Sequence, residues 1–282
     1  MHAPRLLALA AALAALPACG ARTGLDVPFV VNQADCVQTG ASDIYVVTSQ
    51  NQLFSFDPQL AVFHTIGNLN CVDPLGGTPF SMAVARHGHA YVVFNSGSLF
   101  EVSTLDASCT ATGFVPDQLA FRKFGMGFSS NYGGPAETLF VAESSFGTTN
   151  SMGLATIDTT SFTLSFVAPF SPDVANAIEL TGTGDGRLYG LFIDTNAQFS
   201  ASIGPIDKTT GDVPSLAPFS TGLTIDSFAF AFWGGAFYVF HAGNGPPTTV
   251  TRFDPTTGAK QDVATLNGSV VGVGVSTCAP IE

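Results

Sequence analysis

The chain has 282 residues, a formal net charge of −12 and only nine lysines and arginines. Such an acidic chain lacks the basic surface that neutralises phosphates, so its composition argues against a nucleic-acid-binding protein. Its 25 phenylalanines and 30 glycines, with charged residues at only 11%, are typical of many short buried strands joined by tight turns.

The first 18 residues predict a targeting segment rather than part of the fold. Arg5 supplies a positive start, and the apolar run Leu6–Leu16 is too short to span a bilayer. The segment ends in the sequence LPAC (Leu16–Cys19), which resembles a bacterial lipoprotein signal. This resemblance implies cleavage before Cys19 and acylation of that cysteine. A plain secretory signal cut near Ala18 is the alternative.

Acyl chains on Cys19 would hold the protein at a membrane surface without a spanning helix. Gly20, where some such signals have Asp, is compatible with export onward to the outer membrane, by resemblance to enterobacterial sorting signals. We expect residues 19–29 to form a tether and residues 30–282 a single domain, because no Pro/Ser-rich linker or charge run divides them. All-β domains commonly reach this size as one unit.

A repeat of two short predicted strands recurs along this domain, and each copy begins with an aromatic residue. The spacings between successive copies are 46, 49, 49 and 49 residues. A period of about 40 to 50 residues with strand-like content is typical of β-propeller blades. Apolar residues alternate or form short runs between Gly, Pro, Asn and Asp, which excludes helical repeats. The opening residues are Tyr45, Tyr91, Phe140, Tyr189 and Tyr238.

A further predicted strand belongs to each repeat, and most copies of it have alanine or glycine at every second position. Residues two apart in a strand share a face. A face of small side chains suits the innermost strand of a blade, where several blades crowd one axis. The expected innermost strands are Phe80–Ala85, Phe124–Ser129, Asn176–Thr181, Ser227–Phe232 and Val270–Val275.

The two ends of the domain predict a closed ring. The first two-strand repeat has no inner strand before it, and the last inner strand has no two-strand repeat after it. We therefore expect Val270–Val275 to pair with Ile44–Thr48 in one composite blade, which removes the exposed edges. The predicted fold is all-β, a single propeller of five four-stranded blades. Six blades are the alternative if Phe29–Cys36 forms a strand of its own.

Cysteines other than Cys19 number four, which suggests two disulfides in an exported chain, with three pairings open. The closed ring favours Cys36 with Cys278, which would fasten the last strand to the first. Cys71 and Cys109 would then link the first and second blades. Four unpaired thiols are the alternative. A zinc site is disfavoured because the chain has no CxxC pair.

The sequences IDKTTG (Ile206–Gly211) and FDPTTG (Phe253–Gly258) predict turns. They resemble turns in secreted propeller repeats of the NHL, YncE-like and quinoprotein-like types, a likeness that concerns fold and not activity. The Trp-rich signature of quinoprotein blades is absent, since Trp233 is the single tryptophan. The resemblance implies two faces. The turn face carries the turns between first and second strands, and the connection face carries the second-to-third turns and the blade-to-blade connections.

Propellers of many families bind ligands on the connection face, and here that face is expected to be acidic. It would suit a cation, a glycan or a basic protein partner, although Asp and Asn also favour turns for their own sake. Glu179 interrupts an apolar inner strand, and burial in the channel would raise the pKa of its carboxyl. Arg86–His89 is expected to be an exposed turn. The candidate ligand-binding residues are Asn95, Glu143, Asp173, Glu179, Asp194 and His241.

The chain carries no P-loop, HExxH, EF-hand or nucleophile-elbow motif. We therefore expect a lipid-anchored, non-enzymatic module of the cell envelope that binds a ligand or a protein, with no cofactor. The alternative is a calcium-dependent hydrolase or lyase at the channel mouth, because carboxylate and amide oxygens are the ligands that calcium prefers.

Overall fold

The computed structural model describes residue 36 and residues 42–132, 134–144, 151–171, 174, 177–194, 200–219, 227–243 and 245–282. The chain divides into Met1–Val30 and Val31–Glu282, and the description below concerns the second unit. The predicted signal segment, the predicted acylation site Cys19 and the predicted tether lie outside the described residues. No helix in the described parts of the chain is long and apolar enough to cross a membrane.

Within these ranges, strands form five antiparallel sheets of four strands each. The innermost strands are β4 (Pro79–Val84), β8 (Phe124–Ser130), β12 (Ala177–Gly182), β16 (Ser227–Trp233) and β20 (Val270–Val275). The second strands are β5 (His89–Phe94), β9 (Glu137–Glu143), β13 (Leu188–Asp194), β17 (Ala236–Ala242) and β1 (Ile44–Thr48). The third strands are β6 (Leu99–Ser103), β10 (Leu154–Ile157), β14 (Ser200–Pro205), β18 (Thr248–Phe253) and β2 (Gln52–Asp57). The outer strands are β7 (Cys109–Ala111), β11 (Leu164–Ala168), β15 (Ala217–Phe219), β19 (Lys260–Leu266) and β3 (Val62–Asn68).

We number the sheets as blades in ring order. Blade I is β20-β1-β2-β3, blade II is β4 to β7, blade III is β8 to β11, blade IV is β12 to β15, and blade V is β16 to β19. One 3-10 helix, η2 (Gln118–Ala120), lies between blades II and III.

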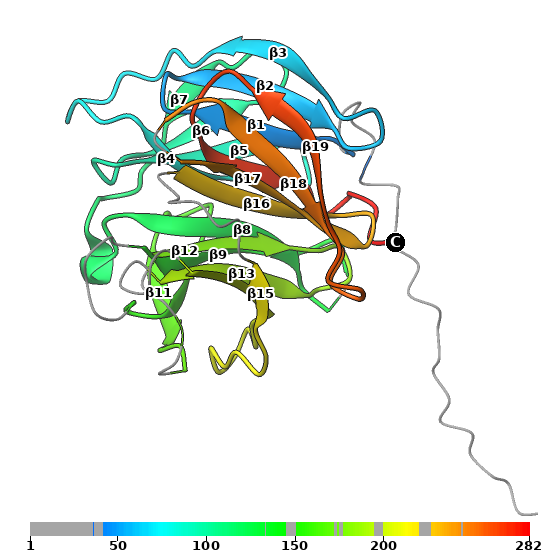
Figure 1. Ribbon diagram of the computed structural model, residues 1–282. Helices are drawn as coiled ribbons and strands as arrows, with labels where there is room; N and C mark the ends of the chain where they lie inside the picture. The colour runs from blue at the N-terminus through cyan, green and yellow to red at the C-terminus, as the bar shows by residue number, and fades with distance from the viewer. Residues whose placement is uncertain are drawn as a thin grey trace, which may run out of the picture. The chain divides into compact units, whose positions relative to one another are not determined.

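The innermost strands contact one another in a closed cycle. Strand β4 lies against β8, β8 against β12, β12 against β16, β16 against β20, and β20 against β4. Figure 1 shows the orange strands of blade V beside the blue strands of blade I, which brings the two ends of the domain together. The prediction of a five-bladed propeller is confirmed, and the described residues give no sixth sheet.

Closure of the ring follows the predicted strand pairing. Strand β20 pairs antiparallel with β1, with Ile44 opposite Val275 and Tyr45 opposite Gly274. Both predicted disulfides are present, Cys36–Cys278 with its Cα atoms 5.7 Å apart and Cys71–Cys109 with its Cα atoms 5.0 Å apart. The first disulfide therefore joins the N-terminal lead-in to the residues that follow β20.

Small residues on the innermost strands are required by close approach of the blades. A Cβ atom on Gly272 would lie 2.7 Å from the backbone nitrogen of Met82, and one on Gly127 would lie 2.9 Å from the carbonyl oxygen of Leu180. A Cβ atom on Gly125 would overlap the carbonyl oxygen of Ile178. Real Cβ atoms do not approach backbone so closely, so these strands can pack only with glycine there.

Phenylalanine fills the space between neighbouring sheets, which explains its abundance. At the interface of blades I and V, the ring of Phe56 lies 6.1 Å from that of Tyr238 and 5.7 Å from that of Phe240, both edge to face. Phe56 and Phe240 have no exposed surface. Burial of each such ring contributes about 1.5–3 kcal/mol, so packing between neighbouring sheets stabilises the closed propeller.

Candidate functional site

A pocket of about 390 Å³ opens between turns of blades III and IV. These turns join first to second strands or third to fourth strands, so the pocket lies on the turn face. The sequence predicted ligand binding on the opposite, connection face. The residues that line the pocket are Asn131, Tyr132, Phe140, Asp185, Gly186, Asp207, Lys208 and Thr209.

Lys208 connects the two blades that form the pocket. It follows β14 of blade IV, and its ammonium donates hydrogen bonds to Ser129 Oγ (3.1 Å) and to the carbonyl oxygen of Ser130 (2.8 Å) in blade III. The same nitrogen lies 5.8 Å from the ring centre of Phe140, within range of a cation–π interaction. Partial burial lowers the pKa of Lys208, and the charge of Asp185 opposes that shift.

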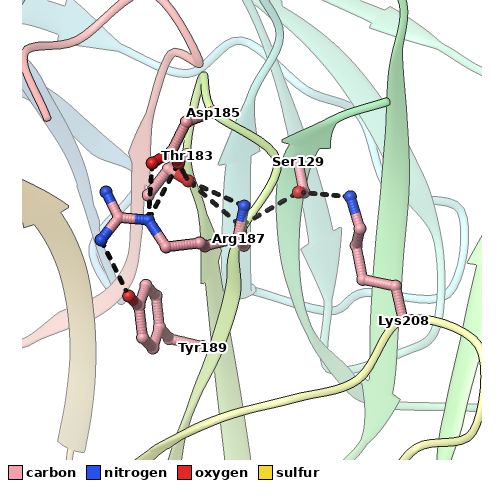
Figure 2. A network of polar contacts seen from close by, with 6 residues as sticks. All are labelled: Ser129, Thr183, Asp185, Arg187, Tyr189 and Lys208. Atoms are coloured by element: carbon pink, nitrogen blue, oxygen red, sulfur yellow. Dashed lines mark hydrogen bonds and ion pairs between the residues drawn. The ribbon is translucent and has the colours of Figure 1, made fainter. Parts of the chain in front are cut away.

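Asp185 is held by a network that also fixes the neighbouring turn (Figure 2). Arg187 Nε lies 2.9 Å from Asp185 Oδ1 and 2.8 Å from Oδ2, and the Thr183 hydroxyl also donates to Oδ1. Burial raises the pKa of Asp185, but the hydrogen bonds from Arg187 and Thr183 outweigh it, so the pKa is lower than usual. Asp185 is therefore ionised, with its charge balanced by a guanidinium.

The network continues in both directions across the blades. Ser129 of blade III donates its hydroxyl to the carbonyl oxygen of Arg187 (3.0 Å). In Figure 2 the side chain of Arg187 points away from Lys208 towards the hydroxyl of Tyr189, to which it donates a hydrogen bond of 3.2 Å. Its guanidinium also lies 5.0 Å from the ring centre of Phe232 in blade V. The contacts that hold Asp185, a lining residue of the pocket, thus extend through blades III, IV and V.

Asp207 begins the predicted IDKTTG turn. Its Oδ1 accepts hydrogen bonds from the backbone nitrogens of Thr209 (2.8 Å) and Thr210 (3.0 Å) and from the Thr209 hydroxyl (2.6 Å). These bonds, with that from the Thr209 hydroxyl first, lower the pKa of Asp207 to about 2. The side chain of Thr210 also lowers the pKa, so Asp207 lines the pocket as an exposed, ionised carboxylate.

Tyr132 is the aromatic residue at the rim. It is 97% exposed, and its φ is 49°, in the left-handed region. The adjacent Asn131 is fixed by the hydrogen bond that its Oδ1 accepts from the Thr138 hydroxyl (3.0 Å). A bulky residue in this conformation costs on the order of 1–3 kcal/mol, and such strain is concentrated at functional sites.

On the connection face, two of the predicted residues accept hydrogen bonds from backbone nitrogens. Asn95 is exposed, and its Oδ1 accepts a hydrogen bond of 3.1 Å from the backbone nitrogen of Thr78. Glu143 is 8% exposed, and its Oε2 lies 3.4 Å from the backbone nitrogen of Met152. Asp194 ends β13, where its register partner is Ser200. Asp173 lies outside the described residues.

His241 lies in the packing between blades IV and V. It is 6% exposed, its ring centre lies 6.1 Å from that of Phe219, and its Nε2 lies 2.9 Å from Thr251 Oγ1. Thr251 in turn donates to Asp262 Oδ1 (2.6 Å). Burial lowers the pKa of His241, opposed by the charge of Asp262. This chain of contacts orders the blade interface and leaves the imidazole little surface for a ligand.

Glu179 crosses the interior of the ring. It starts from β12 of blade IV, and its Oε2 accepts a hydrogen bond of 2.7 Å from the hydroxyl of Ser81 in blade II. Burial raises the pKa of its carboxyl well above the usual value, opposed by hydrogen bonds from Ser81 and from the backbone of Met126. The pKa of Glu179 is therefore raised, in the direction expected for a buried carboxyl. With 3% of its surface exposed, Glu179 links blades rather than meeting solvent.

The turn face carries a cluster of buried polar side chains that the sequence analysis did not predict. Arg86, expected in an exposed turn, is 2% exposed. Glu137 Oε1 accepts from the backbone nitrogen of Arg86 (2.6 Å), and its Oε2 accepts from the hydroxyl of Thr277 (2.8 Å). Burial raises the pKa of Glu137, opposed by these hydrogen bonds. No local pattern could have revealed the cluster, because its members are far apart in the sequence.

The described residues show no grouping of three His, Cys, Asp or Glu side chains able to hold a metal ion. In the predicted turn, His87 and His89 are exposed as expected, and His89 Nδ1 pairs with Glu101 Oε1 at 3.0 Å. The calcium-site interpretation therefore gains no support from this part of the chain.

Comparisons with known proteins show little at the level of sequence. No protein-family model matches the chain, and a search of curated proteins found no match. Among solved structures, the chain is similar to the crystal structure of TolB from Acinetobacter baumannii, with 14% sequence identity and a TM-score of 0.45. The similarity covers 80% of this chain and 53% of that one, so the chain spans about half of that protein's length. The assignment of the fold rests on the strand pairing and ring contacts described above.

Proposed function

We propose that this protein is an envelope-tethered β-propeller that binds a ligand or a protein partner and catalyses no reaction. The observation that carries the proposal is the pocket of about 390 Å³ on the turn face. Binding sites are concave and combine apolar surface with a few well-placed polar groups. This pocket combines Tyr132 and Phe140 with ionised Asp185, Asp207 and Lys208, all within one hollow.

Order in the pocket is the second support. The hydrogen bonds from Lys208 to blade III and from Arg187 to Asp185 are made within the protein itself, before any ligand arrives. A binder whose polar groups are already held loses less conformational entropy on association. The arrangement is what a recognition site requires, and it assigns no group as a nucleophile or a general base.

Export to the cell envelope is part of the proposal. Two disulfides suit an oxidising compartment. Acylation of Cys19 would supply the anchor, and Gly20 favours the outer membrane. Within the domain that would follow the tether, the disulfide of Cys36 with Cys278 joins the N-terminal lead-in to the C-terminal residues.

The test is recovery of partners from a detergent extract of the cell envelope, with the purified protein as bait. One variant, Tyr132→Ala with Asp207→Asn, alters the pocket. A second, Asn95→Ala with Asp194→Asn, alters the connection face and serves as the matched control. We expect the pocket variant alone to lose the partner. Loss with the control variant alone would return the site to the connection face and refute the pocket.

A further inference from the structure

The hydrogen-bonding groups left over in the pocket define the kind of ligand it can take. The ammonium of Lys208 has three hydrogens, and the described residues use two of them, at Ser129 and Ser130. The carboxylate of Asp207 is ionised and exposed, and it lines the same pocket. Two consecutive residues therefore bring a hydrogen-bond donor and an acceptor to one pocket. A pair of neighbouring hydroxyl groups can satisfy both, because each hydroxyl donates and accepts.

Charge in the pocket is nearly balanced. Arg187 neutralises Asp185, which leaves Asp207 and Lys208 as charges of opposite sign. An anionic ligand would meet Asp207 and the chain's formal charge of −12, whereas a cationic ligand would meet the partly buried Lys208. Each ion would leave one of these groups desolvated beside a like charge, which is costly. A neutral polar ligand has neither penalty.

Tyr132 supplies the apolar part of the site. Its side chain is 97% exposed at the pocket rim, and its backbone is in the left-handed region. A flat aromatic face with a hydroxyl tip binds ligands that have one apolar and one polar side. Pyranose rings have this character, with C–H groups on one face and hydroxyls around the edge.

We propose that the pocket binds a neutral glycan, with Tyr132 stacked on a sugar ring and adjacent hydroxyls held by Asp207 and Lys208. The inference rests on the proposed function, since it names the ligand class of the same site. Asn131 and Thr209 line the remaining wall and offer further amide and hydroxyl groups. A neutral saccharide is a different ligand class from the cation or basic peptide that an acidic face would bind.

The experiment measures binding of matched oligosaccharides to the purified full-length protein in detergent, by saturation-transfer NMR and calorimetry. The neutral probes are maltohexaose, cellohexaose, mannohexaose and chitohexaose. Deacetylated chitohexaose is the cationic counterpart, and hexagalacturonate is the anionic one. We expect at least one neutral probe to bind, more tightly than either charged probe, with an affinity that changes little between low and high salt.

Variants locate the binding. Tyr132→Ala should weaken it about tenfold, while Tyr132→Phe should retain most of it because the ring remains. Phe166→Ala is the matched control, since Phe166 is an exposed aromatic residue (47%) on β11 and does not line the pocket. Equal losses for Tyr132→Ala and Phe166→Ala would overturn the assignment to this pocket.

Two further outcomes separate the ligand class from the function. If no neutral probe binds, or only the cationic probe binds in a salt-sensitive way, the glycan inference is overturned. Envelope partners could still be recovered through the pocket in that case, and the proposed function would stand. If the pocket variant also leaves the recovery of partners unchanged, the pocket is not the binding site and the glycan inference falls with it.

Discussion

Removal of the Cys36–Cys278 disulfide tests how the ring is closed. The variant Cys36→Ala with Cys278→Ala leaves the pairing of β1 with β20 in place, because none of those strand residues is changed. It frees the N-terminal lead-in from the residues that follow β20. The expectation is a loss of stability without a change of fold.

The magnitude follows from the length of chain that the disulfide encloses. Its cysteines are 242 residues apart, against 38 for Cys71 and Cys109. In the chain-entropy treatment, closing the longer loop stabilises the folded state by about 5.5 kcal/mol and closing the shorter one by about 4 kcal/mol. Both are upper values, since structure retained in the unfolded chain reduces them.

Urea unfolding followed by tryptophan fluorescence and circular dichroism gives the free energy of unfolding of each protein. The matched control is Cys71→Ala with Cys109→Ala. We expect the Cys36/Cys278 variant to lose at least as much free energy as the control and to show a larger urea m-value, because its unfolded chain is no longer closed into a ring. A single transition should persist if the strand pairing alone still closes the propeller.

Two results would refute this reasoning. An unchanged midpoint would show that β1–β20 pairing and the packing of blade V against blade I suffice for closure. A much larger loss in the Cys71/Cys109 control would show that enclosed length does not govern the effect.

Three further predictions follow from contacts inside the ring. In the wild type, the raised pKa of Glu179 makes stability fall as pH rises from the unfolded pKa through the folded one, by up to about 1.4 kcal/mol per pH unit. Glu179→Gln should remove this pH dependence, and equal differences in stability from wild type at pH 4 and 8 would contradict it. Gly125→Ala should destabilise by about 1–3 kcal/mol through overlap with Ile178, whereas Gly113→Ala, which meets only a side-chain atom at 3.5 Å, should not; urea unfolding of both decides. Lys208→Met should cost about 1–2 kcal/mol by breaking its bonds between blades, and an unaltered urea midpoint would show those bonds to be dispensable.

The sequence by itself determined the architecture. The spacing of Tyr45, Tyr91 and the later aromatics, the alternation of small residues and the unmatched strands at the two ends together implied five sheets and a composite closing blade. A ring closed in this way places Cys36 close to Cys278. These inferences succeed because strand periodicity and repeat length are local properties, and because edges left unpaired are costly wherever they occur.

Only the tertiary structure showed that turns of blades III and IV form a pocket. Lys208 reaches Ser129 across a blade boundary, Glu137 collects Arg86 and Thr277, and the imidazole of His241 is enclosed between two sheets. Each of these depends on how far one blade is rotated against the next, which sets the turns that approach one another. No repeat pattern records that rotation, because it results from side-chain packing summed over the whole interface.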